Sequence, residues 1–151
     1  MIPAIAFFIL LGSAFMPDME NTATDTVQGQ GSIIIELDML ENFEGSIQLS
    51  LFTGPDGFPD DWEKAFTSKT VAVTPEMKEI RLEDIPYGTY GLAIIHDENE
   101  NYKLDTNFFG VPKEGYGFSN NARGRFGPPD YSDTAFKLET ETLVLQIEMK
   151  Y

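Results

Sequence analysis

The sequence contains no cysteine, so disulfide bonds, thiolate zinc sites and cysteine nucleophiles are excluded. Its single histidine, His96, excludes a multi-histidine metal site and argues against a Ser-His-Asp triad. Neither a glycine-rich phosphate loop leading into a helix nor a Gly-x-Ser-x-Gly nucleophile motif occurs. These absences remove most familiar routes to catalysis and favour a binding or structural protein.

Basic residues are also scarce. The chain has 10 Lys and Arg against 25 Asp and Glu, so its formal net charge is 10 − 25 = −15. Such a surface repels nucleic acid and anionic lipid at long range, and no nucleic-acid partner is expected. The 42% hydrophobic and 13% aromatic content nevertheless favours a folded chain over an acidic disordered one. A length of 151 residues suits one domain with a substantial core.

No hydrophobic run is long enough to span a membrane, which takes about 20 apolar residues. The longest extends from Ile2 to Leu11 and is followed by small residues and then a polar stretch. This pattern is typical of a signal peptide, although no Lys or Arg precedes the run; a buried N-terminal strand or helix is the alternative. We therefore predict a signal peptide at 1–16, a linker at 17–31 and one domain at 32–151. The mature protein is expected to be exported to the periplasm or the cell exterior, without a stable membrane span.

Apolar and polar residues alternate with a period of two through most of the domain, which indicates half-buried strands. Seven segments are predicted to be strands, 33–39, 47–51, 70–74, 80–82, 89–95, 133–138 and 142–150, of which 89–95 is the most apolar. They predict an all-β fold, an antiparallel Greek-key β-sandwich. We expect hairpins to join the first two and the last two strands, and the very apolar strand 89–95 to lie centrally. One short helix is predicted at 61–66, with Trp62, Ala65 and Phe66 turned inward.

Residues 103–131 form a long irregular loop rich in Gly, Pro, Asn and Phe. A compact domain rarely carries such a segment unless it is functional or held down by packing. The aromatic residues expected to hold it against the core are Phe108, Phe109, Tyr116, Phe118 and Phe126. In the alternative, exposed side chains of this loop contact an envelope protein or stack on a glycan. The candidate partner surface then comprises Tyr116, Phe118, Asn120, Asn121 and Phe126.

The stretch HDENENYKLDTNFFG, which begins at His96, joins that strand to the loop and is dense in oxygen-bearing side chains. Calcium takes six to eight oxygen ligands, and a short loop can wrap the ion when alternate side chains point inward. Five candidate ligands occupy the first, third, fifth, seventh and ninth places of such a loop: Asp97, Asn99, Asn101, Lys103 through its backbone carbonyl, and Asp105. The spacing predicts a Ca²⁺ loop at 97–105.

The match to a helix-loop-helix calcium site is incomplete. Tyr102 stands at the sixth place, where glycine is preferred, and Phe108 stands at the twelfth, where a bidentate glutamate is usual. Asp and Asn also form turns that satisfy their own backbone, so a metal-free polar turn is an open alternative, as is another cation. A third possibility is a hydrolase that uses His96 with Asp97 or Asp105, although a lone histidine at a strand end is more often a structural hydrogen-bonding group.

Several motifs together resemble one family. They are Pro-x-Gly-Thr-Tyr at 86–90, His-Asp-x-Asn-x-Asn at 96–101, Lys-Leu-Asp at 103–105, Gly-x-Pro-x-Glu-Gly-x-Gly-Phe-Ser-Asn-Asn at 110–121 and Gly-Pro-Pro at 127–129. The chain is similar in these motifs to the DUF2141 family of small secreted bacterial proteins of unknown function. The resemblance is strongest over 85–136 and extends over most of 32–151. It implies an exported location and no established activity, and Tyr102 stands where the family usually has glycine. The Pro-x-Gly-Thr-Tyr turn also resembles prealbumin-like and carboxypeptidase-regulatory-like sandwich modules.

Overall fold

The computed structural model describes residues 29–151. The predicted signal peptide and most of the predicted linker lie outside this range, and within it no helix is long and apolar enough to cross a membrane. The elements in chain order are β1 (Gln30–Asp38), β2 (Ser46–Phe52), η1 (Trp62–Lys64), β3 (Thr67–Ala72), β4 (Ile80–Pro86), β5 (Gly88–Asp97), β6 (Gly115–Phe118), η2 (Ser119–Asn121), α1 (Tyr131–Thr134), β7 (Phe136–Leu138) and β8 (Thr142–Glu148).

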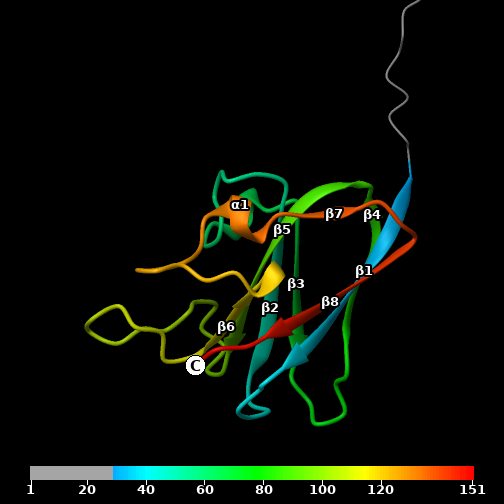
Figure 1. The fold of residues 1–151 in the computed structure, drawn as a ribbon. Coiled ribbons are helices and arrows are strands. Elements are labelled where there is room, and N and C mark those ends of the chain that lie inside the picture. The colour runs from blue at the N-terminus through cyan, green and yellow to red at the C-terminus, as the bar shows by residue number, and fades with distance from the viewer. Residues whose placement is uncertain (1–28) are drawn as a thin grey trace, which may run out of the picture.

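The strands form two sheets (Figure 1). One has three strands in the order β4-β1-β8; the other has the order β3-β2-β5-β6, and β7 pairs with β5 off this path. Buried residues from both sheets, including Ile33 and Ile35 of β1 and Leu49 and Leu51 of β2, form one hydrophobic cluster. The predicted β-sandwich is therefore confirmed, and β5 lies centrally as expected.

The outer face of the larger sheet carries a second, smaller core. Phe52, Ala93 and Phe118 are buried there, with Phe58 and Tyr131 packed against them. The Phe58 ring lies 5.3 Å from that of Phe52 and 5.7 Å from that of Tyr131, both edge-on. This cluster explains how part of the irregular segment 103–131 is held: it covers a sheet face that would otherwise be apolar and exposed.

Both predicted hairpins are wrong. β1 and β2 belong to different sheets, so the loop between them crosses the sandwich. β7 pairs with β5, whereas β8 pairs with β1, and β1 and β8 run parallel. Alternation fixes which face of a strand is buried, but it carries no information about which strand is its neighbour.

Two glycines let the sandwich close at the β6 edge. Gly115 and Gly117 turn toward the chain end, where a Cβ atom would lie 2.6 Å from the Tyr151 ring and 2.7 Å from a methyl carbon of Ile147. The backbones of Tyr116 and Lys150 exchange two hydrogen bonds of 2.8 Å. A strand of the larger sheet is thereby joined to the residues that follow β8 of the smaller one.

The predicted helix at 61–66 is only the single 3-10 turn η1. Of the three side chains expected to turn inward, Ala65 packs against the second cluster, whereas Trp62 is 61% exposed and Phe66 is 47% exposed. The Phe66 ring lies 5.7 Å from that of Tyr90, so it covers the edge of the core. One turn buries too little surface to impose a helical period on the sequence.

Candidate functional site

Asp97, the last residue of β5, lies at the centre of the polar site. Its side chain is on the outer face of the sheet and is 0% exposed. One carboxylate oxygen accepts the Asn101 backbone N–H at 3.0 Å, and the other accepts the Tyr102 N–H at 2.7 Å and the side-chain amide of Gln48. Three N–H donors satisfy this buried charge, so Asp97 fixes the loop to β2 and β5.

The loop turns sharply just after it leaves the strand. Glu100 has φ 58° and Tyr102 has φ 64°, both in the left-handed region. Glycine occupies this region without a steric penalty, whereas a tyrosine there costs roughly 1–2 kcal/mol. The tight turn that a calcium loop requires at its sixth place therefore forms here despite Tyr102, supported by the Asp97 carboxylate.

The remaining polar side chains of the loop converge on Asp105. The side-chain amide of Asn99 donates to one Asp105 oxygen at 2.7 Å, and that of Asn101 donates to the other at 3.0 Å. Asn99 Oδ1 lies 3.1 Å from the Asn101 nitrogen that also donates to Asp97. The structure thus brings together the side chains of four of the five predicted ligands. Lys103, the fifth, is exposed and its backbone N–H donates to Asn101 Oδ1 at 2.9 Å.

These contacts make Asp105 sensitive to pH. Hydrogen bonds from Asn101 and then Asn99 hold the pKa of the Asp105 carboxyl below its ordinary value of 3.8, with smaller contributions from Lys113 and Lys103. Because the folded pKa is depressed, the stabilisation is present above the unfolded value and is lost as pH falls through the folded value. We expect Asp105→Asn to lower the melting temperature at about pH 6 and to have a smaller effect at about pH 3.

Paired thermal melts of the wild type and this variant measure the effect, with Asp130→Asn as the control, since Asp130 is an exposed acid outside the loop. An Asp105→Asn deficit that is equally large at both pH values would contradict the assignment.

Glu114 is a residue that the sequence reasoning missed. It is 4% exposed, and its two carboxylate oxygens accept the backbone N–H groups of Glu98 at 3.1 Å and of Asp105 at 2.8 Å. It therefore bridges both ends of the 97–105 loop from the strand side. The Glu within Gly-x-Pro-x-Glu-Gly was the available signal, because a carboxylate next to an irregular loop suits unpaired backbone donors.

His96 is enclosed on the opposite side of β5. It is 0% exposed; its Nε2 lies 2.7 Å from the Glu44 carbonyl oxygen and its Nδ1 lies 2.7 Å from the Tyr151 hydroxyl. A carbonyl can only accept, so Nε2 carries the proton that it donates to Glu44. Both ring nitrogens are used in holding the 39–45 turn and the chain end, which supports a structural role for this residue.

The donor chemistry of the loop fits a hard cation better than a soft one. Carboxylate and amide oxygens from Asp97, Asn99, Asn101 and Asp105 are ligands that Ca²⁺ accepts. Within residues 29–151, no three His, Asp or Glu side chains are grouped so as to hold a metal. A cation here would therefore depend on amide and backbone oxygens as much as on carboxylates.

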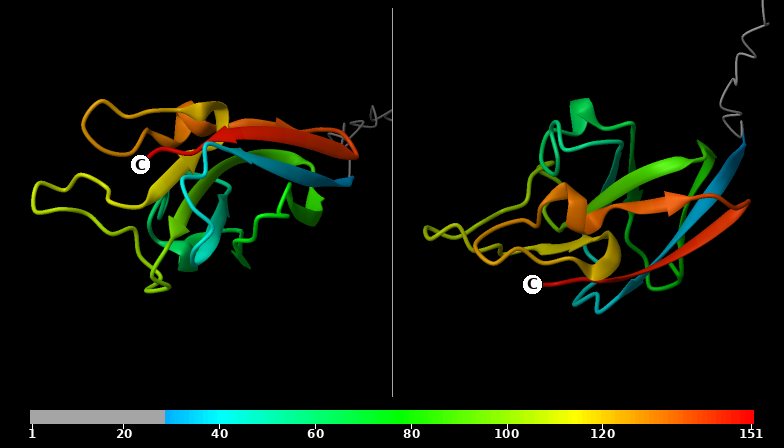
Figure 2. Two further views of the ribbon diagram at one scale, coloured as in Figure 1. Left: turned by 90° about the horizontal axis from the view of Figure 1, so that it is seen from below. Right: turned by 45° about the horizontal axis from the view of Figure 1, so that its top comes forward.

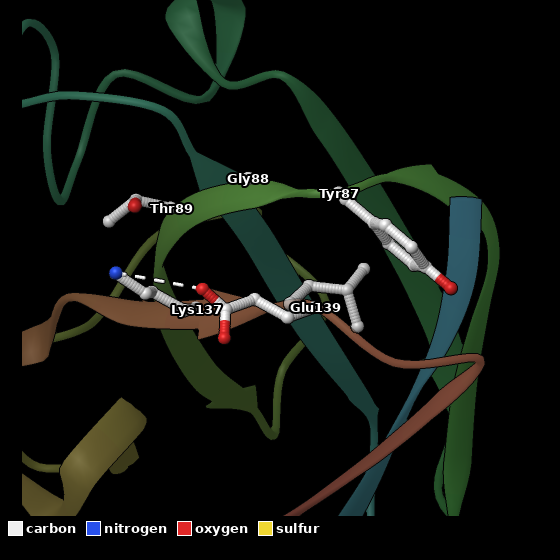
Figure 3. A pocket seen from close by; sticks show the side chains of 6 residues that line it. Tyr87, Gly88, Thr89, Lys137 and Glu139 are labelled. Carbon is white, nitrogen blue, oxygen red and sulfur yellow. Dashed lines mark ion pairs between the residues drawn. The ribbon is translucent and has the colours of Figure 1, made fainter. Parts of the chain in front are cut away.

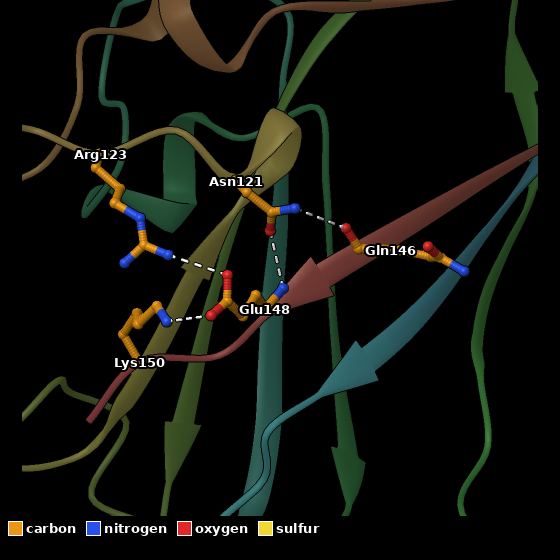
Figure 4. Close-up of polar contacts among 5 residues, drawn as sticks. All are labelled: Asn121, Arg123, Gln146, Glu148 and Lys150. Carbon is orange, nitrogen blue, oxygen red and sulfur yellow. Dashed lines mark hydrogen bonds and ion pairs between the residues drawn. The ribbon is translucent and has the colours of Figure 1, made fainter.

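The residues of the candidate partner surface have different environments. Phe118 is buried and Tyr116 is half-buried. The Asn120 amide donates to the carbonyls of Asp133 and Ala135, at 3.1 and 2.9 Å. The Asn121 side chain accepts from Glu148 N–H at 2.8 Å and donates to the Gln146 carbonyl at 3.3 Å (Figure 4). Of the five residues, only Phe126 is almost fully exposed, at 97%.

The expectation that all five aromatic residues hold the loop against the core is thus partly wrong. Tyr116 and Phe118 pack in the second cluster, whereas Phe108 is 98% exposed and Phe109 is 85% exposed. Asn121, together with the ion pair of 3.1 Å from Arg123 to Glu148, ties the 119–123 stretch to β8, and Lys150 pairs with the same glutamate (Figure 4). Amide groups and short-range packing therefore hold the base of the segment, and its tips are free of the core.

A shallow cavity of about 400 Å³ lies at the far edge of β5, where β7 pairs with it (Figure 3). Residues that line it include Tyr87, Thr89, Lys137 and Glu139. The only ion pair drawn there, between Lys137 and Glu139 at 3.6 Å, is solvent-exposed on both sides. No nucleophile and base converge in this cavity, so the polar loop remains the principal candidate site.

Comparison with known proteins gives one family. The sequence model described as "Uncharacterized protein conserved in bacteria (DUF2141)" matches residues 35–146. This range contains the whole polar loop, Glu114 and the second cluster. The comparison with curated proteins and the comparison with solved structures gave no match.

Proposed function

Since the chain belongs to the DUF2141 family, whose description assigns no activity, we propose that it is a non-enzymatic binding module, from the geometry of the loop, and that it is exported, from the pattern of its N-terminal sequence. In this proposal the loop 97–105 takes a calcium-class cation, and the cation stiffens the junction between β5 and the segment 103–131. That segment presents the binding surface. The observation that carries the proposal is the convergence of Asp97, Asn99, Asn101 and Asp105 around one turn that leaves the central strand.

The expected affinity is modest. A loop with only two anionic ligands is expected to bind calcium as weakly as extracellular calcium modules do, with a dissociation constant of about 10⁻⁴ to 10⁻³ M. The side-chain amides of Asn99 and Asn101 now donate hydrogen bonds to Asp105. To bind a cation, both amides must rotate so that their oxygens face the ion, and these hydrogen bonds are then lost. This rearrangement lies within the loop and leaves the Asp97 bonds to the backbone in place.

A calcium titration tests the proposal. At roughly 5 mM Ca²⁺ we expect a stabilisation of about 1–2 kcal/mol, because a ligand that binds only the folded state stabilises it in proportion to the logarithm of one plus the ratio of free ligand to its dissociation constant. The melting temperature should rise by roughly 5 °C, and equal Mg²⁺ should have less effect because Mg²⁺ demands a stricter octahedral geometry.

The matched variants are Asp105→Asn, which should reduce the calcium shift, and Asp130→Asn, which should keep it. A wild-type melting temperature that does not respond to millimolar calcium would remove the cation from the proposal.

The second candidate is a metal-free interaction module. It is favoured by one observation: the Asp97 carboxylate already has three donors, and Asp105 has two. A loop satisfied in this way needs no ion to be ordered. This candidate predicts no calcium shift together with full binding by the segment 103–131.

A further inference from the structure

Two loops of the irregular segment end in exposed aromatic tips. The first tip carries Phe108, Phe109 and Val111, which are 98%, 85% and 55% exposed; the second carries Phe126, which is 97% exposed. In all three ribbon views both loops project from the same side of the sandwich, the first in yellow-green and the second in amber (Figures 1 and 2). Large apolar side chains gathered in this way mark an interaction surface.

The first tip is ordered although it is exposed. The Asn107 N–H donates to the Val111 carbonyl at 2.8 Å, and Asn107 Oδ1 accepts the N–H groups of Phe109 and Val111 at 2.9 and 3.1 Å. The rings of Phe108 and Phe109 lie 5.5 Å apart, edge to face. The two phenylalanines are therefore held outward by their own turn, which reduces the entropy that binding would cost.

Charge in this region departs from that of the whole chain. Residues 101–127 contain four basic residues, Lys103, Lys113, Arg123 and Arg125, and two acidic residues, Asp105 and Glu114, a balance of 4 − 2 = +2 in a chain of −15. Arg123 is already paired with Glu148 at 3.1 Å, so the basic groups that this surface offers are Lys103, Lys113 and Arg125. Both acids are engaged in hydrogen bonds with the loop. The repulsion expected from the net charge is screened beyond about 8 Å at physiological salt, so a surface that meets these loops first meets aromatic and basic groups.

We propose that the two aromatic tips dock this protein onto the surface of a lipid bilayer that contains anionic headgroups. Aromatic side chains insert at the level of the headgroups, and neighbouring Lys and Arg contact the phosphates. The tips are convex and come from separate loops, which suits an adaptable lipid surface better than a protein groove or a glycan. The inference rests on the proposed binding role and names its partner; it does not require calcium.

Vesicle co-sedimentation of the protein without its predicted signal peptide (1–16) tests the proposal. The buffer contains EDTA, so that calcium cannot bridge protein to lipid. We expect binding to vesicles that contain phosphatidylglycerol, weaker binding to phosphatidylcholine alone, and loss of binding as salt rises. The double variant Phe108→Ser/Phe109→Ser and the single variant Phe126→Ser should each weaken binding roughly tenfold, because binding scales with buried apolar area. Arg125→Glu should weaken it and flatten the salt dependence.

The matched control is Phe43→Ser, which removes a 53% exposed aromatic from the 39–45 turn, outside both tips. It should bind as the wild type does. All four variants change exposed side chains, and unchanged melting temperatures verify their folds. The proposal is overturned if the wild type fails to sediment with anionic vesicles, if the tip variants bind normally, or if Phe43→Ser loses binding equally. The vesicle assay contains no calcium and the calcium titration contains no lipid. A negative result in one experiment therefore does not cause a negative result in the other, and the two proposals can fail separately.

Discussion

Replacing Asp97 with alanine is expected to lower the free energy of unfolding by about 3–5 kcal/mol. The side chain is 0% exposed, and its removal leaves the Tyr102 N–H and the Gln48 amide without this acceptor and the Asn101 N–H with only Asn99 Oδ1. Each donor that loses its acceptor adds to the cost. Urea unfolding followed by tryptophan fluorescence measures the change, since Trp62 is the only tryptophan.

Asp60→Ala is the control, because Asp60 is an exposed acid away from this loop and its loss should change stability by less than about 0.5 kcal/mol. Asp97→Asn keeps the size of the side chain and one acceptor oxygen, so it should fall between the two. If Asp97→Ala unfolds at the same urea concentration as Asp60→Ala, the carboxylate is not the anchor of the loop.

A second large effect is expected at Ser119, where alanine should cost about 2–4 kcal/mol. The hydroxyl is 0% exposed; it accepts the Leu92 N–H of β5 at 2.9 Å and donates to the Thr134 carbonyl of α1 at 2.6 Å. Alanine leaves both backbone groups buried and unpaired. The loss should appear in the unfolding free energy and in faster hydrogen exchange of the Leu92 amide.

Ser132→Ala is the matched change on the exposed side of α1, and it should leave both readouts near those of the wild type. Protection of the Leu92 amide that survives in Ser119→Ala would show that water, or another group, takes over the acceptor role.

The sequence was sufficient to predict the elements whose pattern depends on local burial. β2 alternates because one face meets the main core, with Ile47, Leu49 and Leu51 buried. β5 is apolar almost throughout because both faces are covered, with Leu92 and Ile94 in the main core and Ala93 in the second cluster. The same alternation could not reveal that β8 lies beside β1, because that pairing joins residues such as Leu37 and Ile147 from opposite ends of the domain. Register and partner depend on the whole fold, whereas the period depends on one strand.

The residues of the polar loop could be predicted from the sequence, but the residues outside it that hold the loop in place were not. Asp97, Asn99, Asn101 and Asp105 follow a spacing that can be read directly, and their side chains do converge. Gln48 could not be assigned to the site, because it reaches Asp97 from β2, a strand distant in sequence. Glu114 lies only nine residues after Asp105, and its place in the Gly-x-Pro-x-Glu-Gly motif was the one signal that could have identified it.

Exposure of aromatic residues was the least predictable property. Phe108 and Phe118 lie in the same irregular segment, yet one is 98% exposed and the other 8% exposed. Phe118 belongs to β6 and pairs with Ala93, which directs its ring onto the sheet, whereas Phe108 lies in a turn that satisfies its own backbone. Without a period, the sequence of the segment does not distinguish these two environments.

The parallel pairing of β1 with β8 also determines when the domain can be completed. β1 is the middle strand of its sheet, and the segment that pairs along its second side, 142–148, lies far along the chain from it. Contacts of such long sequence separation form slowly, since the intervening chain must first be ordered. Until then β1 presents an unpaired, apolar edge of the kind that recruits other strands. A chain cut before Thr142 lacks the segment that covers this edge.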